Sequence, residues 1–185
     1  PVVMSVRDEP QAADCAVCIR GELKNPGPIV PRGFVTVASA GPMPRMPADA
    51  SGRLELARWI AGAENPLTAR VMVNRIWQGH FGRGIVANAN DFGNQTPLPS
   101  HPELLDWMAV HFRESGWNVK ELVRLIVTSQ AFRQSSRCSP ELYAIDPENR
   151  LVARAPRLRL DAEQIRDNAL FVSGLIDLAP GGKGV

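Results

Sequence analysis

The 185-residue chain is 44% hydrophobic and 22% charged, which is enough to bury the core of one domain or one and a half. Its net charge of +2 arises from basic residues that are spread along the chain and balanced locally by acids, so no basic tract indicates nucleic-acid binding. No apolar run reaches the roughly 18 residues of a membrane span, and no export signal opens the chain. Because it opens in a strand-like run and stops in GGKGV, we expect a piece of a longer protein, truncated at its C-terminus.

The first 50 residues form a β and loop segment by their composition. They hold 8 of the 16 prolines, and short β-type runs cover residues 2–6 and 15–20, before the turn-rich GELKNPGPIVPRGF. Two or three short strands bury too little area to be stable alone. We therefore expect residues 1–50 to pack on the helical region that follows, as part of it or leading into it.

Helical periodicity begins at residue 51 and predicts helices over residues 52–62, 66–80, 101–115, 119–131 and 162–177. Helix-start signals support this pattern: Asn65 before Pro66, Ser100 with Glu103, Asn118 with Glu121, Asp146 before Pro147, and Asp161 with Gln164. The predicted fold is mainly α, a compact multi-helix domain over residues 51–185 preceded by the short β and loop segment.

Cys15 and Cys18 form a C-x-x-C pair whose context excludes the usual chemistry of that motif. Haem attachment needs a histidine directly after the second cysteine, where Ile19 stands, and zinc needs a second ligand pair that Cys138 and the three histidines do not supply. In a strand, residues three apart lie about 10 Å from each other, beyond the roughly 7 Å limit for a disulfide. We predict free, half-buried thiols and no metal site.

Residues 65–86, NPLTARVMVNRIWQGHFGRGIV, carry polar side chains on a helix that is otherwise apolar. At about 100° per residue, Arg70, Asn74 and Gln78 fall on one stripe, which predicts an enclosed helix with a polar seam. A buried arginine must be paired, because an uncompensated buried charge costs several kcal/mol. Two interpretations stay open, a structural network that ties helices together and a ligand-binding cleft. The acids that we expect to pair with the arginine are Asp161, Glu163 and Asp167.

His101 and Glu103 begin the predicted 101–115 helix beside the loop NDFGNQTPLPSHPE. A neutral imidazole there could lie close to Asp106 or Asp91 and act as a general base. The structural alternative is a histidine in a first helical turn with no chemistry, and no G-x-S-x-G nucleophile motif accompanies it.

Four segments carry a resemblance to a known family. NPLTARVMVNRIWQGHFGRGIV, NDFGNQTPLPSHPELLDWMAVHF, GWNVKELVRLIVTSQAFRQSS and DPENRLVARAPRLRLDAEQIRD resemble, in order and spacing, a C-terminal domain of large planctomycete multidomain proteins. That family is catalogued as domain of unknown function fifteen fifty-three. The resemblance covers about residues 51–185, and VCIRGELKNPG is similar to the β-type segment that precedes the domain.

The resemblance implies a setting rather than a chemistry. Family members are exported, to the periplasm or cell surface, and usually carry an upstream cytochrome-c-like segment, so haem c is expected only in upstream domains and no cofactor in this chain. The expected partners are other domains of the same polypeptide and a sulfatase-like protein, in a polysaccharide-processing context. No nucleic acid and no membrane span are expected. The family supplies no catalytic residues to transfer.

Two functions from different classes follow. The first is a non-catalytic helical module that serves assembly or partner binding. The alternative is an enzyme domain that acts on a complex or sulfated glycan with carboxylates among Asp91, Glu103, Asp106 and Glu163, a pair of which would flank the scissile bond. Nucleic-acid binding through arginines is disfavoured, because acids compensate them. The candidate binding residues are Arg70, Asn74, Gln78, His101, Glu103, Asp161, Glu163 and Asp167.

Overall fold

The structure is a computed structural model that describes the chain except residues 1–4, 9–10, 40, 42, 44 and 180–185. The described part is mainly α, preceded by a short β and loop segment, which confirms the predicted fold class. In chain order the elements are β1 (Cys15–Cys18), β2 (Pro26–Val30), α1 (Arg53–Ala61), α2 (Thr68–Phe81), α3 (Pro102–Glu114), α4 (Val119–Thr128), α5 (Gln130–Arg133), α6 (Pro140–Ile145) and α7 (Ala162–Val172), with 3-10 turns at Ile19–Gly21 and Thr36–Ala38.

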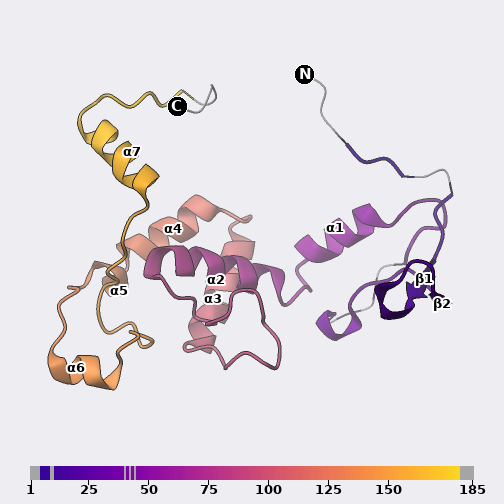
Figure 1. The fold of residues 1–185 in the computed structure, drawn as a ribbon, viewed down its shortest axis with the longest axis horizontal. Coiled ribbons are helices and arrows are strands. Elements are labelled where there is room, and N and C mark those ends of the chain that lie inside the picture. Colours follow the sequence, from indigo (N-terminus) through magenta and orange to yellow (C-terminus); the bar gives the residue numbers. More distant parts are fainter. Residues whose placement is uncertain (1–4, 9–10, 40, 42, 44, 180–185) are drawn as a thin grey trace.

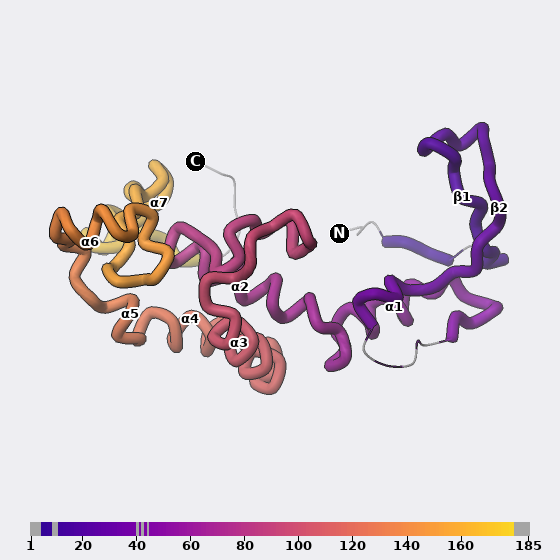
Figure 2. Tube along the Cα trace, turned by 90° about the horizontal axis from the view of Figure 1, so that it is seen from below, coloured from indigo at the N-terminus to yellow at the C-terminus, as the bar shows by residue number. Residues whose placement is uncertain are grey.

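The molecule is elongated. Figure 1 shows the β1–β2 hairpin and α1 at one end, a body of α2, α3 and α4 in the middle, and α6 and α7 at the other end. The view from below in Figure 2 gives the same order along the long axis. Within residues 51–185, where a compact domain is predicted, α2, α3 and α4 pack as one body, and α1 and α7 stand away from it.

Two of the predicted helices end earlier than expected, each for a visible reason. The 119–131 helix is divided into α4 and α5 because Ser129 is extended (φ −63°, ψ 151°) and its hydroxyl caps the Phe132 amide at 3.2 Å. The 162–177 helix stops at Val172. There Gly174 takes a left-handed conformation (φ 74°) and the Leu175 amide donates to the Leu170 carbonyl at 2.9 Å, as in a Schellman motif.

Most of the predicted helix starts are confirmed. Asn65 Oδ1 accepts from the amides of Leu67 and Thr68 at 2.9 and 3.1 Å, so it caps α2 even though the regular helix begins at Thr68. The side chain of Asn118 caps α4, and the Asp161 amide donates to Gln164 Oε1 at 3.3 Å at the start of α7.

Two predicted starts are wrong. Ser100 does not form a capping box with Glu103, because its amide and hydroxyl both donate to the Ile85 carbonyl, at 2.9 and 3.4 Å. Asp146 does not begin a helix, because it closes α6 and turns its carboxylate back onto the next loop.

Two elements escaped sequence reasoning. The start of α6 has its own signal, since Ser139 caps the Leu142 amide at 3.2 Å and Pro140 occupies the first turn. The sequence does not predict strand β2, because its two prolines and its glycine are typical of a turn. Of the predicted β run at residues 2–6, residues 2–4 lie outside the described residues, and Ser5 and Val6 are not in a strand.

The N-terminal segment packs on α1. The strands pair antiparallel, with Cys15 opposite Val30. Trp59 of α1 stacks on Phe34, with 5.4 Å between ring centroids, and its indole N–H donates to Ser39 Oγ at 3.2 Å. Figure 1 shows this end of the molecule separate from the α2–α4 body.

The core lies where α2, α3 and α4 meet. Its buried side chains come from these helices and from the loop after α2, and they are Val73, Trp77, Ile85, Val86, Leu105, Met108, Phe112, Leu122 and Ile126. Burying each such side chain contributes about 1.5–3 kcal/mol, so this cluster is the main source of stability among the described elements. Phe112 also meets Trp117 edge to face at 5.3 Å, which fixes the turn between α3 and α4.

One fully buried polar side chain crosses this core. Asn74 has no exposed surface, and its amide bonds the backbone of Val86 twice, donating to the carbonyl at 3.1 Å and accepting from the N–H at 2.9 Å. Gly84 makes the approach possible, because a Cβ there would lie 2.4 Å from the Val86 oxygen and 2.7 Å from Asn74 Nδ2. The side chain thus pairs with the loop as a neighbouring strand would.

Removing this bridge should destabilise the chain. We expect Asn74→Ala to lower the free energy of unfolding by about 2–4 kcal/mol, because it leaves two buried backbone groups unpaired. Gly84→Ala should also destabilise, through the steric clash. Urea unfolding followed by circular dichroism measures both. Gly79→Ala is the matched control, since nothing lies within 4 Å of its added Cβ, and it should stabilise α2 by about 0.5–1 kcal/mol. An unchanged Asn74→Ala midpoint would refute the bridge.

Candidate functional site beside the C-terminus of α2

The predicted polar seam separates into a buried half and a half-exposed half. Asn74 is a structural tie, as described above. The Arg70 side chain is 35% exposed, donates through Nε to Asp106 Oδ1 at 2.6 Å, and also bonds the Pro66 carbonyl. Gln78 is half-buried on the same helix. The expectation that Arg70 is largely removed from solvent is therefore wrong.

The expected partners of Arg70 are also wrong. Arg70 is held by Asp106 because α3 packs directly against α2, whereas Asp161, Glu163 and Asp167 are exposed at the distant α7. The hydrogen bond from Arg70 lowers the pKa of Asp106 below its usual value, against desolvation that raises it, and the arginine charge lowers it further. An ion pair as open as this one contributes at most about 1 kcal/mol, so Arg70 is not a buried structural anchor.

His101 does not join either of the acids expected beside it. Its Nδ1 lies 3.0 Å from Ser100 Oγ, Asp106 is occupied by Arg70, and Asp91 Oδ1 accepts from the Gly93 amide at 2.8 Å. Glu103 is exposed in the first turn of α3. Among the residues that the structure describes, no three His, Cys, Asp or Glu side chains gather as a metal site would require. All three cysteines are free, and Cys15 and Cys18 are exposed rather than half-buried.

The loop after α6 is built around two buried charges that sequence reasoning did not single out. Asp146 is 6% exposed and accepts from the amides of Arg150 and Leu151, both at 2.8 Å. Arg154 is 9% exposed and donates to the carbonyls of Asp146 and Pro147, at 2.9 and 2.8 Å. Each charge is therefore satisfied by backbone, which folds the segment DPENRLVAR into a closed loop.

Asn149 completes this loop and shapes its strained end. Its amide donates to the Arg154 carbonyl at 2.8 Å and accepts from the Arg154 amide at 3.2 Å. Val152 takes a left-handed conformation (φ 55°), which is costly for a β-branched residue, by about 1–3 kcal/mol. The Gln134 side chain donates to the Val152 carbonyl at 2.7 Å, and the Val152 side chain packs on the core. The hydrogen bond from Gln134 and the packing of Val152 on the core maintain this strained conformation.

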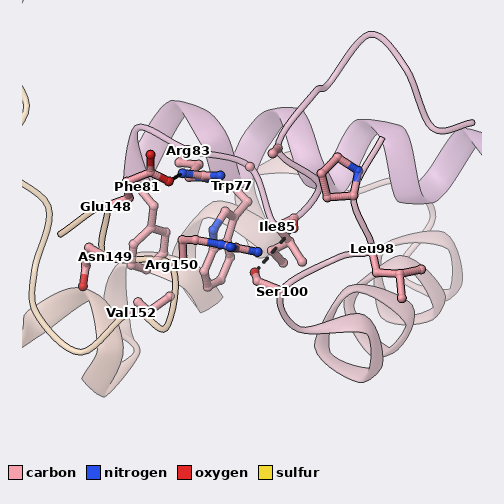
Figure 3. A pocket seen from close by; sticks show the side chains of 13 residues that line it. Trp77, Phe81, Arg83, Ile85, Leu98, Ser100, Glu148, Asn149, Arg150 and Val152 are labelled. Carbon is pink, nitrogen blue, oxygen red and sulfur yellow. Dashed lines mark hydrogen bonds and ion pairs between the residues drawn. The ribbon is translucent and has the colours of Figure 1, made fainter. Parts of the chain in front are cut away.

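A cavity of about 100 Å³ lies where this loop meets α2 and the loop that Asn74 holds. Figure 3 shows it between Trp77 and Phe81 on one side and Ser100 and Leu98 on the other. The two rings stack on each other with centroids 4.1 Å apart. At the rim Arg83 pairs with Glu148, while the side chain of Arg150 extends across the opening. The cavity thus has the Trp77 and Phe81 rings on one side and charged side chains at its mouth.

None of the predicted binding residues lines this cavity. The sequence signal that could have found it is the pattern in DPENRLVAR, where an aspartate before proline is followed by two arginines and an asparagine. Such residues fold a loop onto its own backbone. This loop forms a site only because it faces α2 and the 82–100 loop, and that arrangement cannot be predicted from the sequence pattern.

Comparison with known proteins identifies one family. The model of PSD1, described as a protein of unknown function (DUF1553), matches residues 52–185. No curated protein and no solved structure matches the chain. None of the described helices is long and apolar enough to cross a membrane.

The loop around Asp146 predicts a pH-dependent stability. Burial raises the pKa of Asp146, but the amides of Leu151 and Arg150 and the charges of Arg154 and Arg150 together lower it below the ordinary 3.8. Because the folded-state pKa is the lower one, this stabilisation is complete above about pH 5 and is lost as the pH falls through the folded-state pKa.

We therefore expect Asp146→Asn to cost about 2 kcal/mol at pH 7, since an amide cannot accept from both backbone donors. Urea unfolding of both proteins at pH 7, 5 and 3 measures the difference, which should shrink at pH 3. Asp167→Asn, on exposed α7, is the control and should change stability by less than about 0.5 kcal/mol. A difference that is equal at all three pH values would contradict the role given to the carboxylate.

Proposed function

This chain belongs, through residues 52–185, to the PSD1 family of unknown function (DUF1553), and we propose that its helical domain is a non-catalytic module that binds other domains of the same polypeptide. The observation that carries the proposal is the solvent exposure of α7. Every residue of this helix is exposed except Leu170, which is half-buried. Figure 1 shows α7 standing away from the α2–α4 body.

The exposed side chains of α7 form an apolar stripe. Ile165, Ala169 and Val172 follow one another at the spacing of one helical face, and Ile165 and Val172 are 54% and 81% exposed. Leu175 and Leu178 extend the apolar surface beyond the helix, at 75% and 73% exposure. Exposed apolar side chains that are grouped in this way are typical of a protein-interaction surface.

A linked domain is a better occupant of this stripe than a freely diffusing partner. An independent interface needs about 1,000 Å² or more of buried surface, which one face of an 11-residue helix does not supply alone. A domain on the same polypeptide has an effective concentration in the millimolar range, so a small apolar contact is sufficient. The acids Glu163 and Asp167 lie on the opposite face of the helix, where they keep that side in water.

The alternative, a glycan-cleaving enzyme, has no comparable support. Of its four candidate carboxylates, Asp106 is paired with Arg70, Asp91 caps its own loop, Glu103 is exposed on α3, and Glu163 lies on α7. A glycosidase needs two carboxyl groups within about 10 Å of each other across an open groove. The described structure offers no such pair with a shared cavity among these acids.

The sequence resemblance supports the setting of this module. We propose an extracytoplasmic location, haem c only in upstream domains, and a polysaccharide-processing context with a sulfatase-like protein as a further partner. In that setting the module would hold domains together while the chemistry occurs elsewhere in the polypeptide or on the partner.

Hydrogen exchange tests the proposal directly. The experiment compares the 185-residue chain with a longer polypeptide that contains it. We expect the amides of residues 165–178 to exchange at least about tenfold more slowly in the longer polypeptide, because docking protects them. Ile165→Ser with Val172→Ser should abolish this protection. Glu163→Ser with Asp167→Ser, on the opposite face, should leave it intact. Equal exchange in both polypeptides would sink the proposal.

A further inference from the structure

Arg150 differs from the two other arginines near it. Arg83 is paired with Glu148, and Arg154 is buried with its guanidinium on two backbone carbonyls. The guanidinium of Arg150 makes neither an ion pair nor a hydrogen bond in the part of the chain that the structure describes, although its backbone amide binds Asp146. Figure 3 shows this side chain extending over the cavity toward Ser100. Arg150 is exposed, and its unpaired guanidinium therefore lies at the mouth of the cavity.

The nearby acids form no ion pair with Arg150, although its charge helps to lower the pKa of Asp146. Both oxygens of Asp146 accept backbone amides, and Glu148 is occupied by Arg83. The guanidinium keeps its full set of donors, in a fixed fork that matches a carboxylate. Beneath it, Trp77 and Ile85 are 7% and 3% exposed, and Val152 closes the wall. The site thus combines one exposed, unpaired cation with a lining that is partly aromatic and aliphatic.

The size of the cavity limits its occupant. A cavity of about 150 Å³ accommodates one benzene molecule, so the roughly 100 Å³ here accommodates a group of about four heavy atoms. We propose that this cavity binds a carboxylate on a short aliphatic arm, with the arm against Trp77 and the carboxylate on Arg150. This inference is independent of the role of α7.

Electrostatics favour a carboxylate over a phosphate or sulfate group. A dianion is usually held by several cationic or backbone N–H donors, whereas this rim offers one unpaired guanidinium and the carboxylate of Glu148 stands on the same rim. The fixed negative charge of Glu148 therefore repels a dianion more strongly than a monoanion. The planar monoanion also matches the fork of Arg150.

Titration of the 185-residue chain with propionate, followed by two-dimensional ¹H–¹⁵N NMR, tests the proposal. We expect saturable shifts of the Trp77 indole and of the Ser100 and Arg150 amides. Arg150→Gln should weaken binding about tenfold or more, because a charge-assisted pair is lost. Arg124→Gln, which removes an equal charge from the exposed side of α4, should change it by less than about twofold. Ala87→Leu, which enlarges one side chain of the lining and keeps Arg150, should also weaken binding.

Two further probes identify the source of the carboxylate. Tighter binding of propionate than of N-acetylglutamate amide indicates a free small acid, and the reverse order indicates an acidic side chain of a polypeptide; both support the proposal. Propanamide, the neutral isostere, should not bind. Propanamide that binds as well as propionate, inorganic phosphate that binds more tightly, or propionate shifts that survive Arg150→Gln would each overturn it.

Discussion

The double hydrogen bond between the Asn74 amide and the Val86 backbone organises the centre of this structure. It fixes a loop without regular secondary structure to the middle of α2, and Ile85, in the same short stretch, accepts from Ser100 at the start of α3. One side chain therefore sets the distance between α2, the loop and α3. Ile85 and Val86 can join the apolar core only because the polar groups of their backbone are satisfied in this way.

The cavity depends on this bridge and on a second loop that is closed by its own charges. Asn74 positions one wall, at Gly84 and Ile85, while the backbone contacts of Asp146 and Arg154 position the other, at Asn149 and Val152. Polar residues buried for structural reasons thus leave Arg150 without a partner between the two walls. The surface proposed to bind other domains lies elsewhere, on α7, so the two inferences rest on separate parts of the chain.

The sequence predicts the helices well and the site poorly, for different physical reasons. Helix positions follow from local periodicity and caps, which is why Asn65, Asn118 and Asp161 mark real starts. Partners follow from three-dimensional packing, which periodicity does not contain. Asn74 was expected to be buried and is buried, yet Arg70 one turn earlier faces Asp106 rather than the acids at α7.

The central claim is that the polar seam of α2 is a structural tie at Asn74 and that binding takes place outside it. Native-state hydrogen exchange of the Val86 amide is the most direct measurement. If the bridge to Asn74 holds the loop, this amide opens only with global unfolding, and its exchange free energy equals that from urea unfolding. Exchange as fast as that of the exposed Asn88 amide in the same loop would show that the bridge does not hold, and would contradict the account.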